Sequence, residues 1–99
     1  MSFTTTQPEM LADAAGRLAS IGSTIANQNA AAAGSTTAVF PAAADQVSVL
    51  TAAQFATYGQ LYQLIGAQAN AILGMFVNTL SGSAGSYAVT EAANAVITG

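Results

Sequence analysis

The stretch QVSVLTAAQFATYGQLYQLIGAQANAILGMFVNTL, residues 46–80, is long, apolar and uncharged. No Asp, Glu, Lys or Arg occurs anywhere between Asp45 and Glu91. A helix on the surface of a soluble protein normally keeps charged residues on the face that water covers. A chain of 99 residues has little surface of its own to cover such a helix. The stretch therefore predicts a helix that another protein covers.

Local signals around this stretch predict an all-α chain that folds as an antiparallel helical hairpin. Thr6 and Glu9 predict a capping box, in which each side chain bonds to the other residue's backbone amide, and Pro8 suits the first helical turn. Asp45 is the expected N-cap of the second helix. Segments rich in Gly and Ser are expected to end both helices. The expected ranges within one domain are a first helix at about 7–33, a connection at about 34–44, a second helix at about 45–81 and a C-terminal tail at 82–99.

The large apolar residues of the second helix form two adjacent rows, and one row is expected to pack on the first helix while the other packs on something outside. The first row is Val47, Leu50, Tyr58, Leu61, Ile65, Ile72 and Phe76. The second row is Phe55, Tyr62, Leu73 and Leu80. The first helix carries a narrow seam of Leu11, Leu18, Ile21 and Ile25. Two helices cannot cover all of these side chains, so an obligate partner is expected to bind them.

Three glycines interrupt the second helix, at Gly59, Gly66 and Gly74. Each costs about 1 kcal/mol relative to alanine in a helix interior. Either they allow a close approach of two helices, or the helix simply tolerates them. The sequence leaves both explanations open.

The composition leaves little catalytic chemistry. The chain has four acidic residues, a single Arg, no Lys, no His and no Cys, and its net charge is −3. We therefore expect no enzyme activity, no cofactor and no metal site. A nucleic-acid partner is not expected, because nothing in the chain could neutralise phosphate groups. Residues 1–9 have neither the basic nor the apolar region of a Sec signal peptide, so any export is expected to use another machine.

Part of the uncharged stretch, residues 64–80, is long enough to cross a bilayer. Gln68, Asn70 and Asn78 interrupt it, and no Lys or Arg flanks it. A helix that is buried in a protein complex is therefore the favoured interpretation.

Tyr87 and Glu91 lie four residues apart, so in a helical tail they would share one face. An aromatic and an acidic residue in an otherwise uncharged tail could form a recognition site. The alternative is that Tyr87 packs on the hairpin and Glu91 only keeps the end of the chain soluble.

Four blocks of the sequence resemble the PE proteins of mycobacteria, over the whole length of the chain. They are the Pro8-Glu9 pair, residues 36–48 (TTAVFPAAADQVS), residues 75–80 (MFVNTL) and the Tyr87-x-x-x-Glu91 spacing, which is similar to the export signal of type VII secretion substrates. The chain is most similar to short proteins that consist of a PE domain alone and are handled by the fifth ESX system.

The resemblance implies a specific partner and route. It implies a helix-turn-helix domain that pairs one-to-one with a PPE-family protein in a four-helix bundle. An EspG-type chaperone would bind the PPE subunit in the cytoplasm. The ESX secretion machinery would then export the pair to the cell envelope, the cell surface or the medium, with Tyr87 and Glu91 as the export signal.

Two other functions stay open at this point. The protein could insert into the envelope after export and contribute to solute permeability of the outer membrane. It could also form a self-sufficient homodimeric helical bundle.

Overall fold

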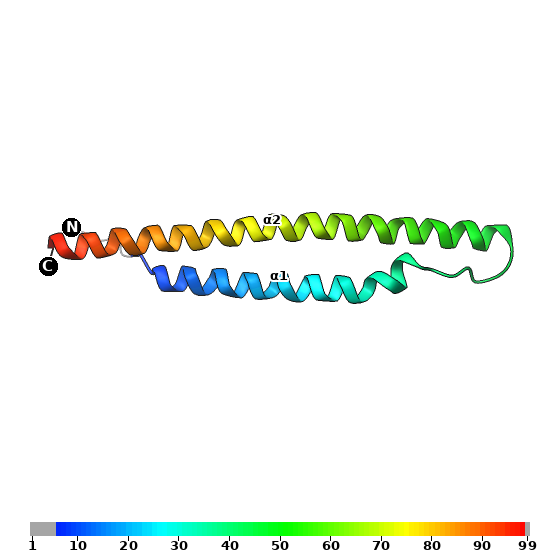
Figure 1. Cartoon of the computed structure of the whole chain (residues 1–99), viewed down its shortest axis with the longest axis horizontal. Helices are drawn as coiled ribbons and strands as arrows, with labels where there is room; N and C mark the ends of the chain where they lie inside the picture. The colour runs from blue at the N-terminus through cyan, green and yellow to red at the C-terminus, as the bar shows by residue number, and fades with distance from the viewer. Residues whose placement is uncertain (1–5, 99) are drawn as a thin grey trace. The chain divides into compact units, whose positions relative to one another are not determined.

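A computed structural model of the chain describes residues 6–98. It contains two helices, α1 (Pro8–Thr37) and α2 (Gln46–Thr98), and no strand within the described range (Figure 1). The prediction of an all-α chain with two long helices is confirmed.

The helices contribute to two compact units. One unit combines the residues up to Ile21 with those from Ile72 onward, and the other consists of Gly22–Ala71. In the Gly22–Ala71 unit, α1 and α2 run antiparallel, because Asn29 contacts Tyr62 while the later residue Thr36 lies against the earlier Gly59. This unit is a helical hairpin whose connection is residues 38–45. In the other unit, the first turns of α1 lie beside the second half of α2, and the end of α2 extends past the start of α1 (Figure 1).

The start of α2 confirms the predicted cap. The Ser48 backbone amide donates to Asp45 Oδ1 at 2.9 Å, and the Ser48 hydroxyl donates to Asp45 Oδ2 at 2.9 Å. The carboxylate thereby satisfies one of the first amides of the helix, which have no partner within the helix itself. Asp45 thus fixes the position at which the connection ends and α2 begins.

The start of α1 differs from the prediction. The helix begins at Pro8, and the Gln7 carbonyl oxygen accepts hydrogen bonds from the Met10 and Leu11 amides. The amide and hydroxyl of Thr6 both bond to Glu91, so the capping box expected between Thr6 and Glu9 is wrong. Glu91, a residue of α2, thus accepts the hydrogen bond from the Thr6 amide that Glu9 was expected to accept.

Both helices are longer than predicted. α1 continues to Thr37 rather than ending at about 33, and α2 continues to Thr98 rather than ending at about 81. The segment 82–86 was expected to break the helix because of its glycines, and this expectation is wrong. Leu80 is half-buried and Ala84 is only 4% exposed. Packing of this face therefore outweighs the weak helix propensity of Gly82 and Gly85.

Mostly small residues line the contact between the helices. On α2, buried or half-buried residues repeat every three or four positions in each unit, and we call this set the inner seam. The inner seam of α2 is Ala52, Ala56, Gly59, Gln63 and Gly66 in one unit and Leu73, Val77, Leu80 and Ala84 in the other. On α1 the corresponding residues are Leu11, Ala15, Leu18, Gly22, Ala26, Asn29, Ala33 and Thr37.

Little apolar volume is buried in these contacts. Among residues 6–98 the buried hydrophobic residues are Ala15, Ala52 and Ala84, and no large side chain is fully buried. A buried alanine contributes much less than the roughly 1.5–3 kcal/mol of a buried Leu, Ile or Phe. The chain alone therefore has a thin core.

Gly59 allows the closest backbone contact. A Cβ atom at position 59 would overlap the Thr36 carbonyl oxygen and would lie 2.7 Å from the Thr36 carbonyl carbon. At Gly66 the nearest atom is the movable Asn29 Nδ2, at 3.1 Å, and at Gly74 nothing lies within 4 Å. Of the two explanations for the glycines, close approach holds at Gly59 and simple tolerance holds at Gly74.

We expect Gly59→Ala and Gly74→Ala to change stability in opposite directions. The first must push two backbones apart, which typically costs about 1–3 kcal/mol. The second gains helix propensity of about 0.5–1 kcal/mol at an open position. Thermal unfolding followed by circular dichroism would measure both variants. An equal gain in both would contradict the close contact at Gly59.

The Asp45 cap predicts a pH dependence at the start of α2. The hydrogen bonds from the Ser48 amide and then the Ser48 hydroxyl hold the pKa of Asp45 below its usual value of 3.8. The stabilisation is therefore fully present above pH 3.8 and is lost as the pH falls through the lower folded-state pKa. The NMR shift of the Ser48 amide should report this loss. Asp45→Asn, which caps without titrating, should show no such transition.

Candidate partner-binding surface

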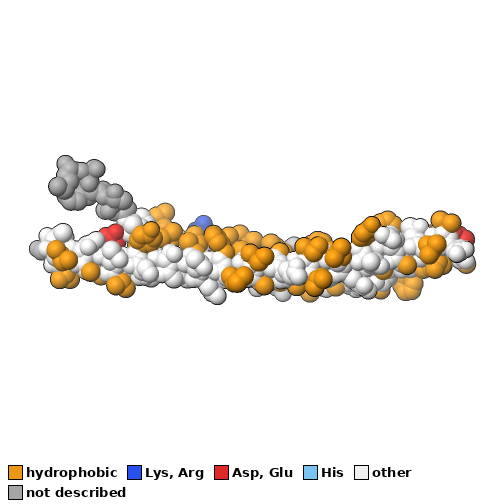
Figure 2. Space-filling view, turned by 90° about the horizontal axis from the view of Figure 1, so that it is seen from above, with side chains coloured by type: hydrophobic (Ala, Val, Ile, Leu, Met, Phe, Trp, Pro, Cys, Tyr) orange, Lys and Arg blue, Asp and Glu red, His pale blue; other side chains and the backbone are white. Residues whose placement is uncertain are grey.

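Most of the large apolar side chains of this protein lie on its surface. Figure 2 shows hydrophobic side chains spread over the visible face, with few charged ones between them. Among the residues predicted to bind a partner, Leu11 and Leu18 are half-buried against α2. The others are all exposed, and they are Ile21, Ile25, Val47, Leu50, Phe55, Tyr58, Leu61, Tyr62, Ile65, Ile72 and Phe76.

Neither of the two predicted rows of α2 packs as a whole on α1. All residues of the first row are exposed. In the second row Leu73 and Leu80 are half-buried, whereas Phe55 and Tyr62 are 59% and 56% exposed. The expectation that a whole row faces α1 is wrong, because the small residues of the inner seam occupy most of that face.

The exposed residues of α2 include a second regular seam. In the Gly22–Ala71 unit, Phe55, Tyr58, Tyr62 and Ile65 are spaced by three, four and three residues, which is the spacing of a heptad seam. The same spacing along the sequence reaches Ile72 and Phe76 in the other unit, by way of Ala69. We call these six large residues the outer seam, and they are Phe55, Tyr58, Tyr62, Ile65, Ile72 and Phe76. Such a seam is suited to packing against another helix.

Another face of α2 has a different composition. Ala53, Gln60, Ala67 and Gly74 follow each other at seven-residue intervals, and all are exposed. This face carries only small or polar side chains at these positions. The outer seam is distinguished by its regular spacing, because other large side chains of α2, such as Leu61, Leu64 and Met75, are exposed as well.

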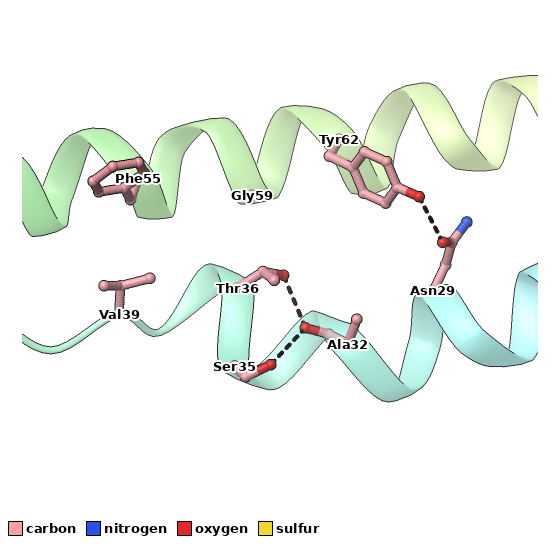
Figure 3. A pocket seen from close by; sticks show the side chains of 8 residues that line it. All are labelled: Asn29, Ala32, Ser35, Thr36, Val39, Phe55, Gly59 and Tyr62. Carbon is pink, nitrogen blue, oxygen red and sulfur yellow. Dashed lines mark hydrogen bonds between the residues drawn. The ribbon is translucent and has the colours of Figure 1, made fainter.

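A groove of about 520 Å³ lies between α1 and α2 in the Gly22–Ala71 unit, next to Gly59. Its lining residues come from α1, the connection and α2 (Figure 3), and they are Asn29, Ala32, Ser35, Thr36, Val39, Phe55, Gly59 and Tyr62. Phe55 and Tyr62 of the outer seam form one wall, so the groove is continuous with that seam.

Polar atoms around the groove bond within the protein. Tyr62 Oη donates to Asn29 Oδ1 at 2.9 Å, and Gln63 Nε2 donates to the Asn29 backbone oxygen at 2.9 Å. The hydroxyls of Ser35 and Thr36 donate back to the Ala32 carbonyl oxygen, at 3.2 Å and 2.8 Å (Figure 3). With these groups paired, the groove offers mainly apolar contact to a binding partner.

The described residues also contain no metal-binding cluster. Residues 6–98 include no group of three or more His, Cys, Asp or Glu that could hold an ion. The groove itself is lined by hydroxyl, amide and apolar groups and contains no acid or base.

Tyr87 and Glu91 both lie on α2, in the unit that contains the start of α1. Tyr87 is 46% exposed, beside a shallow groove of about 540 Å³. Glu91 is half-buried, and its Oε1 atom accepts hydrogen bonds from Thr6. The alternative in which Glu91 only keeps the end of the chain soluble is wrong, because the carboxylate holds a specific partner.

Pro8 and Glu9, the other predicted motif residues, form the first turn of α1. Pro8 is half-buried and Glu9 is exposed. Pro8 occupies the first helical position, where its missing amide hydrogen costs nothing.

Sequence reasoning missed several residues that shape this surface. Asn29 and Gln63 connect the helices, and Thr6 binds Glu91. The regular spacing of Ala52, Ala56 and Gly59 is a signal for the inner seam. Nothing near Thr6 in the sequence indicates its distant partner.

α2 also meets the length and composition expected of a membrane-spanning helix. An 18-residue window within it has a mean hydropathy of 1.2, and none of that window is buried in the chain. Core helices of soluble proteins can have the same length and composition, but they are mostly buried. α2 differs from such core helices in that this window is exposed in the chain alone.

The sequence is similar to proteins of the PE family, whose sequence profile matches residues 4–94. PE family protein PE13 of Mycobacterium tuberculosis is 58% identical over 95 residues, which make up 96% of this chain and 96% of that protein. PE family protein PE8 of the same species is 56% identical over 94 residues, or 95% of this chain and 34% of PE8. PE cleavage protein A, also from M. tuberculosis, is 52% identical over 92 residues, or 93% of this chain and 16% of that protein. The chain thus spans nearly all of PE13, about a third of PE8 and about a sixth of PE cleavage protein A.

Proposed function

The chain belongs to the PE family, and on that premise we propose that it is the non-enzymatic half of a one-to-one heterodimer with a PPE-family protein. The pair forms a four-helix bundle, with two helices from each subunit. A type VII (ESX) secretion system exports the pair.

The outer seam is the observation that supports this proposal most strongly. Six large apolar side chains at heptad spacing are exposed on α2. Aromatic and branched residues of this kind are typical of the buried centre of a protein–protein interface. A partner helix would bury them in the same way that α1 covers the inner seam.

The thin core supports the same proposal on energetic grounds. Among the described residues the buried hydrophobic ones are three alanines, while many large apolar side chains of α2 are exposed. Burial of one Phe or Ile side chain contributes about 1.5–3 kcal/mol. A partner that covers the outer seam would therefore add several such contributions to the stability of the chain.

The rest of the proposal concerns the route of the complex. In the cytoplasm an EspG-type chaperone binds the PPE subunit and keeps the pair ready for export. The ESX machinery, which we propose is that of the fifth system, then recognises Tyr87 and Glu91 as an export signal. The pair is delivered to the envelope, the cell surface or the medium. The exposure of Tyr87 supports its role as a recognised residue.

Co-expression tests the pairing directly. The chain would be produced alone and beside candidate PPE proteins, and light scattering would give the mass of the soluble species. We expect a soluble complex of one-to-one mass with a PPE protein only. A soluble, folded homo-oligomer of this chain alone would overturn the pairing and favour the homodimeric bundle.

Charge substitutions in the outer seam should abolish the complex. Phe55→Asp or Ile65→Asp would place a carboxylate in an apolar interface, and an uncompensated buried charge typically costs several kcal/mol. Gln60→Asp is the matched control, because it adds the same charge on the face of α2 that carries small and polar residues. Co-purification should fail for the first two variants and succeed for the control. Normal complex formation by Ile65→Asp would place Ile65 outside the interface.

Replacement of Tyr87 tests the export signal. Tyr87→Ala removes the exposed ring from a helix that keeps its backbone, so the complex should form normally. We expect the variant to accumulate in the cytoplasm, and immunoblots of cell and medium fractions would measure it. Secretion of Tyr87→Ala at the normal level would end the assignment of Tyr87 to the signal.

A second function is favoured by the exposed apolar window of α2. After export, α2 could insert into envelope lipid and contribute to solute permeability. Extraction separates the two proposals, because a lipid-inserted protein is released only by detergent, whereas a soluble heterodimer is released without it.

A further inference from the structure

The contact between Thr6 and Glu91 joins two segments that are 85 residues apart in sequence. Glu91 Oε1 accepts the Thr6 hydroxyl at 2.8 Å and the Thr6 backbone amide at 3.4 Å. Both residues are half-buried, and both belong to the same compact unit. We call this pair the Thr6–Glu91 clasp.

The position of the clasp explains why a carboxylate suits it. Thr6 lies two residues before Pro8, the first residue of α1. The helix dipole makes this end of α1 positive, which favours a negative charge beside it. A carboxylate from α2 therefore stabilises the start of α1, and its hydrogen bonds are stronger than those of a neutral acceptor. Glu91 is the only charged residue after Asp45, so no other side chain of α2 could do this.

The side chain of Tyr87 is more exposed than that of Glu91. It lies one helical turn before Glu91 on α2. Its ring is 46% exposed, beside a groove lined by Gly82, Ser83 and Ser86. Tyr87 is thus available to another molecule, whereas Glu91 is occupied within the chain.

We propose that Glu91 acts in export as a positioning residue, which clasps the segment before α1 to the last turns of α2 through Thr6, while Tyr87 is the residue that the machinery contacts. This inference rests on the export signal argued under Proposed function. The signal is then a surface built from two segments, and it exists only when this unit is folded. Thr6 becomes an export residue although it lies outside the Tyr-x-x-x-Glu spacing.

The first test measures the clasp itself. Amide hydrogen exchange would be followed at residues 87–95 in the full-length chain, in the complex in which it is soluble. Thr6→Val keeps the shape of the side chain but removes the hydroxyl donor, and exchange should become roughly five- to tenfold faster. Thr6→Ser keeps the donor and should restore slow exchange. Unchanged exchange in Thr6→Val would overturn the clasp.

A double-mutant cycle makes this test specific. If Thr6 and Glu91 act through each other, the double variant Thr6→Val/Glu91→Ala should exchange no faster than either single variant. If the increase in exchange rate of the double variant equals the product of the two single increases, each residue acts separately. That result would overturn the clasp.

The second test is export of the same variants. Thr6→Val should lose export as Glu91→Ala does, and Thr6→Ser should be exported normally. Tyr87→Ala should lose export with slow exchange intact, which separates recognition from positioning. Normal export of Thr6→Val beside blocked export of Tyr87→Ala would overturn the role of the clasp and leave the signal standing. Normal export of Tyr87→Ala would instead overturn the signal.

Discussion

At Gly59 the backbone of α2 lies against the Thr36 carbonyl group of α1, and no side chain separates the two helices there. Such a short distance between helices is compatible only with small residues along the contact, and Ala52, Ala56 and Gly66 provide them. Large side chains cannot fit between helices at this distance. In the Gly22–Ala71 unit the large side chains of α2 therefore lie beside this contact or on other sides of the helix, where they are exposed. In the other unit the contact also includes the larger residues Leu73, Val77 and Leu80.

The sequence was sufficient to predict two long helices and the Asp45 cap. These features depend on local signals and on the absence of charge, both of which can be recognised without coordinates. The continuation of α2 through Gly82 and Gly85 could not be predicted in the same way. Helix propensity is a local quantity, whereas the burial of Ala84 depends on α1 being placed against it. Tertiary packing decided the outcome.

The same difference between local and tertiary information explains the errors at the candidate surface. Sequence reasoning grouped the large residues of α2 into two rows and expected one whole row to face α1, as the apolar face does in most amphipathic helices. Here Phe55 and Tyr62 are more than half exposed at the edge of the contact with α1, where they line the groove, and Gly59 and Gln63 face α1. A seam of small residues has the same period as a seam of large ones, so periodicity alone cannot tell which seam lies within the chain. The Gly59 contact with the α1 backbone distinguishes them.

A seam of small residues has a further consequence for register. Alanines and glycines interlock weakly, so they specify poorly how far one helix is shifted along the other. Single polar groups supply this information, as they do in coiled coils. Asn29 bonds to Tyr62 and Gln63 in one unit, and Thr6 bonds to Glu91 in the other. If α1 moved by one turn along α2, Thr36 would meet Phe55 or Gln63 in place of Gly59, and Asn29 would lose both partners. Gly59 and the polar contacts therefore act together: the glycine permits the approach, the hydrogen bonds fix the register, and the register determines which side chains remain exposed.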